Sequence, residues 1–151
     1  MRARCIPIRE MCSNLFNDER KCIMAGQPIN PKGSPPPLAP YSPGFRAGET
    51  VYTSGILPLD LDGNLVGGDD VGAQTRQVLD NINAILEAAG GSMNDVVFNL
   101  IFLADLDDYQ KMNDVYGSFF PDNPPARACI QAGLVKPEFK VEIAATASIS
   151  K

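Results

Sequence analysis

The clearest hydrophobic pattern in the chain lies between residues 71 and 89. The positions of one stripe recur there every three or four residues: Val71, Thr75, Val78, Leu79, Ile82, Ile85, Leu86 and Ala89. This spacing follows the turn of an α-helix and places the stripe on one face. Asp69 or Asp70 can cap the start, and Gly90 and Gly91 can end the helix with a left-handed turn. We predict an amphipathic helix over residues 71–89.

A second helix is predicted over residues 107–120. Its apolar face is supplied by Tyr109, Met112, Val115, Tyr116, Phe119 and Phe120. Asn113 lies beside this face. Pro121 ends the helix, because proline lacks the N–H that helical hydrogen bonding needs. The loop of residues 122–125 then leads into the next apolar stretch.

Strands are predicted where β-branched and aromatic residues gather. Residues 50–57 form the first such stretch, and Gly55 within it indicates a bulge or a close approach to backbone or ligand. Asp62-Gly63-Asn64 is a turn signal, so a return strand is expected at Leu65 and Val66. Residues 96–103 are almost continuously apolar, which is typical of a strand covered on both faces, in a sheet centre or a subunit interface.

The last two predicted strands each carry one charged residue among apolar neighbours. These residues are Arg127, in residues 125–133, and Glu142, in residues 140–147. Alternation in the second strand points Glu142 to the face opposite its apolar neighbours. A hairpin folded about residues 134–135 would bring Arg127 and Glu142 opposite each other. The pair could then hold an anionic substrate and a water molecule, or form a cross-strand ion pair worth less than about 1 kcal/mol.

Taken in order, the elements are expected to be β-β-α-β-α-β-β in a single α+β domain. Two helices of this length can cover only one face of the sheet. The other face needs a partner, and another copy of the same chain is the expected one.

The segment before these elements divides into two parts. Residues 1–26 are predicted to be a disordered or upstream-start extension outside the domain of residues 27–151, since their apolar residues follow no clear period. An organelle-targeting peptide is a weaker alternative, because the segment contains acidic residues. Residues 27–44 are rich in proline and should be extended, largely outside any ladder. Tyr41 in this segment could close over a pocket or pack the segment down.

Composition restricts the chemistry. The 151-residue chain has no histidine and a net charge of -5. A Ser-His-Asp triad is therefore ruled out, the commonest metal ligand is missing, and a broad nucleic-acid footprint is disfavoured. No apolar stretch approaches the roughly 18 residues of a membrane span. Cys129, the single cysteine of the expected core, suits a reducing compartment, so a cytoplasmic location is expected.

Several stretches resemble the Rid family of reactive intermediate deaminases. They are Ala39 to Gly44, Tyr52 to Gly55, Ala73 to Arg76, Leu86 to Gly90, Phe119 to Pro121, Pro125 to Cys129 and Val141 to Ile143. The resemblance covers nearly the whole chain after its leader. It implies a chorismate-mutase-like α+β fold of the bacillus type, with helices on one sheet face and a homotrimer with sites between subunits.

Within that family the chain looks most similar to the RutC subgroup, the 3-aminoacrylate deaminases of pyrimidine utilisation. The features are Pro37-Leu-Ala-Pro40 and the segment from Cys129 to Pro137. The resemblance implies hydrolysis of 3-aminoacrylate to malonate semialdehyde and ammonia. Two alternatives stay open: a general deaminase of 2-aminoacrylate and related 2-imino acids (2-iminobutanoate, 2-iminopropanoate), and a non-catalytic regulatory trimer that binds small molecules.

The resemblance also implies roles for individual residues. Arg127 would clamp the substrate carboxylate, and Glu142, kept ionised by a nearby arginine, would activate water. Tyr41, Gly55, Asn113 and Cys129 would line the pocket. A nucleophilic Cys129 is disfavoured, because nothing in the chain could deprotonate it as a histidine does. No cofactor, metal, nucleic acid or membrane partner is expected.

Overall fold

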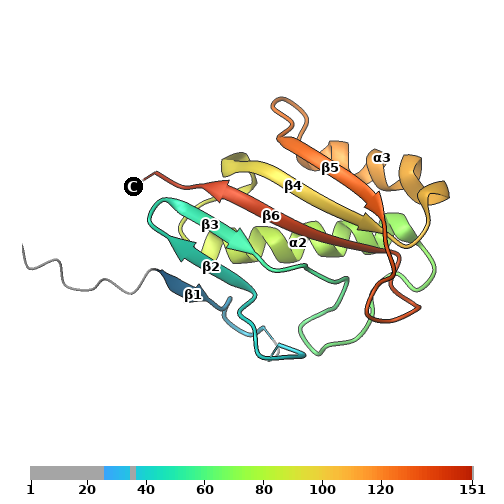
Figure 1. Cartoon of the computed structure of the whole chain (residues 1–151), viewed down its shortest axis with the longest axis horizontal. Helices are drawn as coiled ribbons and strands as arrows, with labels where there is room; N and C mark the ends of the chain where they lie inside the picture. The colour runs from blue at the N-terminus through green and yellow to red at the C-terminus, as the bar shows by residue number, and fades with distance from the viewer. Residues whose placement is uncertain (1–25, 35–36, 151) are drawn as a thin grey trace, which may run out of the picture.

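The computed structural model describes residues 26–34 and 37–150, and within them one mixed sheet is covered on one face by two helices (Figure 1). The strand order is β1-β2-β3-β6-β4-β5. The strands and helices are β1 (Gln27–Ile29), β2 (Gly44–Ala47), β3 (Thr50–Thr53), α2 (Val71–Ala88), β4 (Val96–Leu103), α3 (Tyr109–Phe119), β5 (Ala126–Gln131) and β6 (Val141–Ser148). Short 3-10 turns, η1 (Met93–Asp95) and η2 (Leu106–Asp108), precede β4 and α3. The structure thus confirms a single α+β domain with both predicted helices.

Helix α2 forms where its sequence pattern predicts. The Asp70 side chain caps its start and accepts hydrogen bonds from the backbone N–H groups of Gly72 at 2.8 Å and Ala73 at 3.2 Å. Gly90 follows the helix with a φ of +83°, a conformation that glycine adopts without a steric cost. The predicted stripe is buried against the sheet, so hydrophobic burial fixes the position of this helix.

The core lies between the helices and the inner sheet face. Fully buried Leu79 and Ile82 of α2 belong to the same cluster as Ile101 of β4 and Ile143 of β6. Alternate residues of β6, from Val141 to Ala147, are buried. This alternation confirms the prediction that Glu142 points to the other face.

The predicted hairpin of the last two strands is wrong. Strand β4 lies between them, parallel to β5 and antiparallel to β6. Helix α3 carries the chain back along the sheet, so β5 enters in the direction of β4, as in a parallel crossover. The segment after β5 then passes the end of β4, where the N–H groups of Ala132 and Ala104 donate to Leu103 and Lys140 at 2.9 Å.

Buried Gln74 of α2 holds this crossing segment. Its amide nitrogen donates to the backbone oxygen of Glu138 at 3.0 Å, and its amide oxygen accepts from the N–H of Lys140 at 2.7 Å. A buried polar side chain of α2 therefore satisfies backbone groups that no strand pairs. The helical spacing of apolar residues does not predict this contact.

The first half of the sheet also differs from expectation. The strand predicted at residues 50–57 ends at Thr53, and it pairs with β2 rather than with residues 65–66. Leu65 makes only an isolated bridge to Leu59. Part of the proline-rich segment does join the ladder, because β1 pairs with β2 and its one proline lies at the sheet edge. The predictions for residues 1–25 lie outside the described residues.

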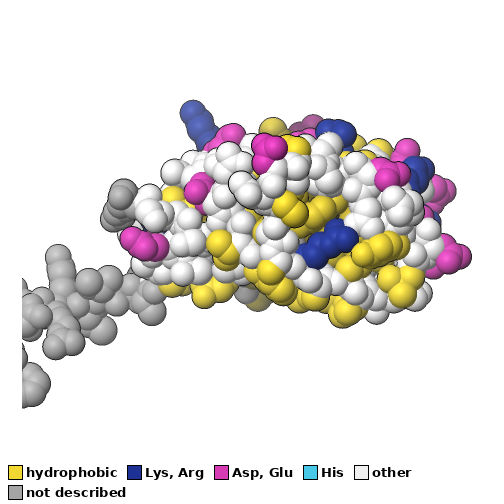
Figure 2. Space-filling view, turned by 90° about the horizontal axis from the view of Figure 1, so that it is seen from above, with side chains coloured by type: hydrophobic (Ala, Val, Ile, Leu, Met, Phe, Trp, Pro, Cys, Tyr) yellow, Lys and Arg dark blue, Asp and Glu magenta, His cyan; other side chains and the backbone are white. Residues whose placement is uncertain are grey.

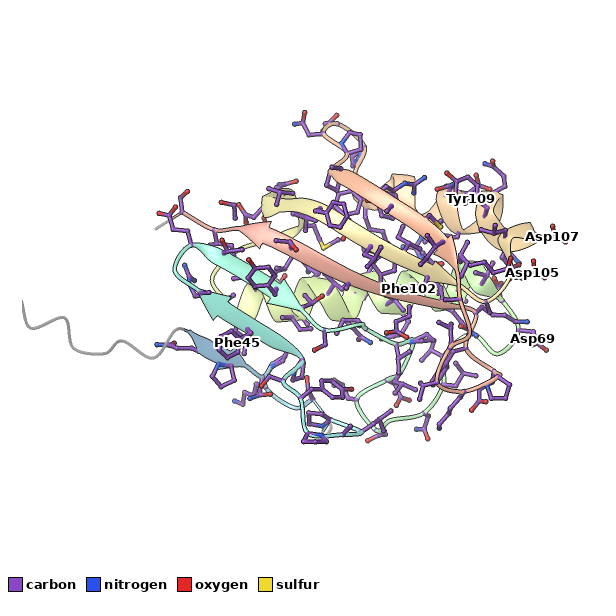
Figure 3. All side chains as sticks on the ribbon, viewed as in Figure 1. Phe45, Asp69, Phe102, Asp105, Asp107 and Tyr109 are labelled. Atoms are coloured by element: carbon purple, nitrogen blue, oxygen red, sulfur yellow. The ribbon has the colours of Figure 1, made fainter. Side chains whose placement is uncertain are left out.

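The outer face of the sheet carries exposed apolar side chains. Phe45 and Tyr52 are paired across β2 and β3, and Phe98 of β4 continues the same row. Their exposed fractions are 41%, 49% and 39%. Figure 3 shows the side chains of Phe45 and Phe102 on the ribbon with α2 behind the sheet. Strand β4 is an inner strand, between β6 and the edge strand β5, and in a single chain it is covered on one face rather than on both as predicted.

Within the described ranges, neither helix combines the length and the hydropathy that crossing a bilayer needs.

Candidate functional site

Arg127 lies on the helix side of the sheet. It is paired in register with Asn99 of β4, so the two side chains share a face. Helix α3 covers this position. The guanidinium donates from Nη2 to the hydroxyl oxygen of Tyr109 at 3.1 Å. Its central carbon lies 5.7 Å from the ring centre of Tyr109 and 4.8 Å from that of Tyr116, which are cation–π distances.

Asn99 is a site neighbour that the sequence analysis missed. It is fully buried and donates from Nδ2 to the hydroxyl oxygen of Tyr116 at 2.9 Å. Asn99 Oδ1 and Arg127 Nη1 are both buried and have no hydrogen-bond partner among the described residues. One is an acceptor and the other a donor, on paired positions of one face. Asn99 is the one polar residue in the apolar stretch of residues 96–103, and this exception could have marked it as a site residue.

Burial keeps two side chains around Arg127 in their neutral forms. It raises the pKa of the Tyr116 hydroxyl, an effect that the hydrogen bond from Asn99 and the charge of Arg127 partly offset. Burial likewise raises the pKa of the Cys129 thiol, again partly offset by Arg127. Cys129 is half-buried on the same face, two residues after Arg127. A protonated thiol supports pocket lining rather than nucleophilic attack.

Asn113 is half-buried on α3 between the two tyrosines. Tyr109, Asn113 and Tyr116 are spaced at i, i+4 and i+7, so they share one face of the helix. The structure therefore brings three of the predicted site residues, Arg127, Asn113 and Cys129, to the layer between α3 and β5. Figure 2 views the molecule from this side and shows a basic side chain lying among hydrophobic ones.

Glu142 lies on the outer face of the sheet, paired with Phe102 of β4. It is half-buried, and burial raises the pKa of its carboxyl group. Ile56 exchanges backbone hydrogen bonds with Ile143, at 2.8 and 3.2 Å, which holds Gly55 beside Glu142. A Cβ atom on Gly55 would overlap Oε1 of Glu142. The close approach predicted at Gly55 is therefore to a side chain of the site.

The segment that carries Tyr41 is hydrogen-bonded to the segment that carries Gly55. The Ser54 hydroxyl donates to the backbone oxygen of Ser42 at 2.7 Å, and the Ser54 N–H donates to Pro43 at 2.9 Å. These bonds tie the Tyr41 segment to the residue before Gly55. Both residues line a mostly apolar cavity of about 330 Å³. Its other lining residues include Leu38, Ile56, Leu57 and Ile85.

The six predicted site residues therefore form two groups in one chain. Arg127, Asn113 and Cys129 lie under α3, whereas Glu142 lies on the outer face with Gly55 beside it, and Tyr41 is tied to Gly55 through Ser54. The predicted face-to-face arrangement of Arg127 and Glu142 is wrong, because β4 separates their strands and their side chains point to opposite faces. For the same reason, no arginine of the described ranges lowers the pKa of Glu142, which burial raises.

Comparison with known proteins identifies the family. The family model described as Endoribonuclease L-PSP matches residues 32–149. The 3-aminoacrylate deaminase RutC of Acinetobacter baylyi is 54% identical over 121 residues, which are 80% of this chain and 96% of that protein.

Solved structures are similar to the fold of this chain. TdcF of E. coli with bound serine has a TM-score of 0.75 and 34% identity, covering 82% of this chain and 99% of that one. YyfA of Yersinia pestis, described as a member of the conserved Rid protein family, has a TM-score of 0.77 and 33% identity, covering 83% and 100%. The chain therefore belongs to the L-PSP, or Rid, family, as its sequence motifs indicated.

Proposed function

We propose that this protein is a deaminase that hydrolyses 3-aminoacrylate to malonate semialdehyde and ammonia in pyrimidine breakdown. The observation that carries the proposal is its 54% identity to a 3-aminoacrylate deaminase over nearly the whole of that protein. The two groups of site residues suit this chemistry. One offers a cation for a carboxylate, and the other offers a carboxyl group that can move protons.

Arg127 binds the substrate carboxylate in this proposal. A guanidinium is always charged and presents several donors in one plane, which suits an anionic carboxylate. The rings of Tyr109 and Tyr116 hold the group at cation–π distances. The enamine end of the substrate then extends from a fixed point, so the reacting carbon is positioned for attack.

Glu142 handles the protons. The enamine first becomes an imine: a proton adds to the carbon next to the carboxylate and another leaves the nitrogen. Water then adds to the C=N carbon, and Glu142 passes one of its protons to the nitrogen, which gives a carbinolamine. Glu142 next moves the hydroxyl proton to the nitrogen, the C–N bond breaks with its electron pair on nitrogen, ammonia leaves and the aldehyde C=O forms. Burial raises the pKa of Glu142, and a carboxyl group with a raised pKa exchanges protons more readily near neutral pH.

The two groups meet when chains assemble. We propose a homotrimer in which Arg127 of one subunit and Glu142 of another face the same substrate. Two features support assembly: the apolar outer face of the sheet and the open edge of β5, which is the last strand in the sheet order. The number three follows from the family resemblance. A cytoplasmic location is proposed with it, and the free Cys129 thiol is compatible with reducing conditions.

A second candidate substrate is 2-aminoacrylate, whose hydrolysis gives pyruvate and ammonia. The structure of TdcF holds serine, a small amino acid with the same three-carbon skeleton. Arg127 could bind either carboxylate, and the site residues would be the same. The distance from Arg127 to Glu142 in the assembly would select between an amine on the second carbon and one on the third.

The test is ammonia release by the purified protein from each enamine, generated in situ. Faster decay of 3-aminoacrylate than of 2-aminoacrylate, lost in Arg127→Ala, is the expected result. Acceleration of 2-aminoacrylate alone would make the protein a general imine-clearing enzyme. Acceleration of neither substrate would contradict a deaminase function and favour a binding protein.

A further inference from the structure

Two aromatic side chains, those of Tyr109 and Tyr116, hold the Arg127 guanidinium. Its Nη1 atom is buried and has no hydrogen-bond partner among the described residues, and the strand register pairs Arg127 with buried Asn99 of β4. Nη2 points to the Tyr109 hydroxyl, and the Tyr116 ring lies 4.8 Å from the central carbon. One end of the guanidinium therefore faces the interior, and the other faces the exposed side, where Tyr109 stands. A carboxylate arriving from solvent meets the Nη2 end.

The hydroxyl group of Tyr109 can still donate a hydrogen bond beside the Nη2 end of the guanidinium. Its hydroxyl oxygen accepts a hydrogen bond from Nη2, so its own O–H proton stays free to donate. Among the described residues no acceptor takes this proton. The side chain is 40% exposed. Figure 3 places Tyr109 beside β5, with Asp105 and Asp107 further towards the end of the molecule.

We propose that Tyr109 is a second substrate-binding donor, whose hydroxyl binds the substrate carboxylate together with Nη2 of Arg127. Nη2 carries two hydrogens, so it can donate to Tyr109 and to a carboxylate oxygen at once. The phenol oxygen and Nη2 lie 3.1 Å apart, side by side at the exposed end. The substrate carboxylate is the anion expected there, so the assignment of this ligand rests on the proposed function.

Tyr116 does not share this role. It is 5% exposed, and its hydroxyl accepts from buried Asn99. Removing that hydroxyl would leave a buried amide without its partner and would disturb the fold. Removing the Tyr109 hydroxyl leaves only a partly exposed Arg127 nitrogen, which water can satisfy. Tyr109 can therefore be changed without disturbing the core.

The test is the Tyr109→Phe variant, which keeps the ring and removes the hydroxyl. Ser118→Ala is the matched control: it removes an exposed hydroxyl from the same helix, one that bonds only to the helix backbone at Val115. We expect Tyr109→Phe to raise KM for 3-aminoacrylate about tenfold, the loss typical of a hydrogen bond to a charged group, with kcat changed less than about twofold. Both variants should keep the melting temperature of the parent.

A binding measurement separates this inference from the proposed reaction. Propionate carries a carboxylate and cannot be deaminated, so its Kd, measured by calorimetry, needs no turnover. Tyr109→Phe should weaken propionate binding about tenfold, and Ser118→Ala should not change it. If no enamine is hydrolysed but this loss is seen, the proposed function fails and the Tyr109 assignment stands. Equal Kd values in parent and Tyr109→Phe, or no propionate binding by the parent, would overturn the assignment.

Discussion

Strand register decides which face of the sheet each charged site residue occupies. Arg127 follows Asn99 to the helix side, and Glu142 follows Phe102 to the outer side. Each then takes its properties from its surroundings: aromatic rings hold the guanidinium, and burial raises the pKa of the carboxyl. Substitution of either residue can therefore be interpreted separately.

Arg127→Ala should abolish deamination while the protein stays folded. Among the described residues Arg127 makes one side-chain hydrogen bond, at an exposed position, and its guanidinium lies over the rings of Tyr109 and Tyr116, so we expect its loss to cost a modest amount of stability without unfolding the protein. Losing a charged partner for the carboxylate weakens transition-state binding by about 1.5–3 kcal/mol per hydrogen bond, which is about 10- to 100-fold in kcat/KM for each. The measurement is ammonia release with thermal unfolding.

Arg76→Ala is the control for charge removal, because Arg76 lies over another ring, that of Phe119, at 5.6 Å. It should keep kcat/KM within about twofold of the parent. Normal turnover by Arg127→Ala would remove Arg127 from the site.

Glu142→Gln should remove the acidic limb of the pH profile of kcat. In the parent, kcat rises as the carboxyl ionises, and burial moves that rise above the pH expected of an ordinary glutamate. When the enzyme is saturated, the substrate carboxylate offsets the charge of Arg127, so burial remains the main influence on the pKa of Glu142. A profile measured from acid to neutral pH checks this.

The contribution of Glu142 to the free energy of unfolding should fall as the pH rises, whereas kcat should rise. A carboxyl group whose pKa is raised on folding stabilises the protein at low pH, and this stability is lost as pH rises through the raised pKa. Glu142→Gln should therefore be more stable than the parent near neutral pH, and the difference should shrink in acid. Glu138→Gln, in a surface loop, should change neither profile. An unchanged kcat profile in Glu142→Gln would place water activation elsewhere.

At the scale of elements, the break between β3 and the bridge at Ile56 brings Gly55 against Glu142. The break interrupts pairing along β6 and leaves room for a carboxyl group where a continuous strand would put a side chain. On the other face of the sheet, helix α3 positions Arg127, because Tyr109 and Tyr116 on one face of the helix contact its guanidinium. The site thus depends on one interrupted strand and one helix.

Gly55→Ala should lower kcat by at least about tenfold with a small loss of stability. The new Cβ overlaps the end of the Glu142 side chain, which can rotate away but then leaves its working position. Gly117→Ala on α3 is the control, since its Cβ would meet open space. That variant should be more stable by about 0.5–1 kcal/mol, from helix propensity, with normal activity. Normal kcat in Gly55→Ala would show that Glu142 needs no fixed position.

At the scale of the whole molecule, one sheet face is buried under two helices and the other is left apolar. Phe45, Tyr52 and Phe98 form a row across that outer face, and Glu142 lies on the same face. A stable assembly would bury this row and would enclose Glu142 with it. Activity and assembly should therefore be lost together.

Phe98→Glu should dissociate the proposed trimer and abolish activity, because a charge buried in an apolar interface without a partner is strongly unfavourable. Sedimentation velocity would show a monomer. Leu106→Glu is the control: Leu106 is equally apolar and 47% exposed, but it lies in η2, away from the outer face. A trimer that persists in Phe98→Glu would mean that another surface joins the subunits.

The sequence by itself determined both helices, the buried face of β6, and the family. Helical spacing in α2 and alternation in β6 depend only on local geometry and hydrophobic burial, so they are visible in one stretch of chain. The short motifs around Tyr41, Arg127 and Glu142 indicated the family, because each can be recognised within one stretch of the sequence. These features need no knowledge of which segments lie side by side.

Only the tertiary structure decided which strands are neighbours and where the site residues stand. β5 and β6 are adjacent in sequence yet both pair with β4, because α3 returns the chain parallel to it. That choice separated Arg127 from Glu142, brought Asn99 and Tyr109 to Arg127, and left Glu142 with a pKa raised by burial. Pairing depends on contacts between distant segments, and a local pattern carries no information about them.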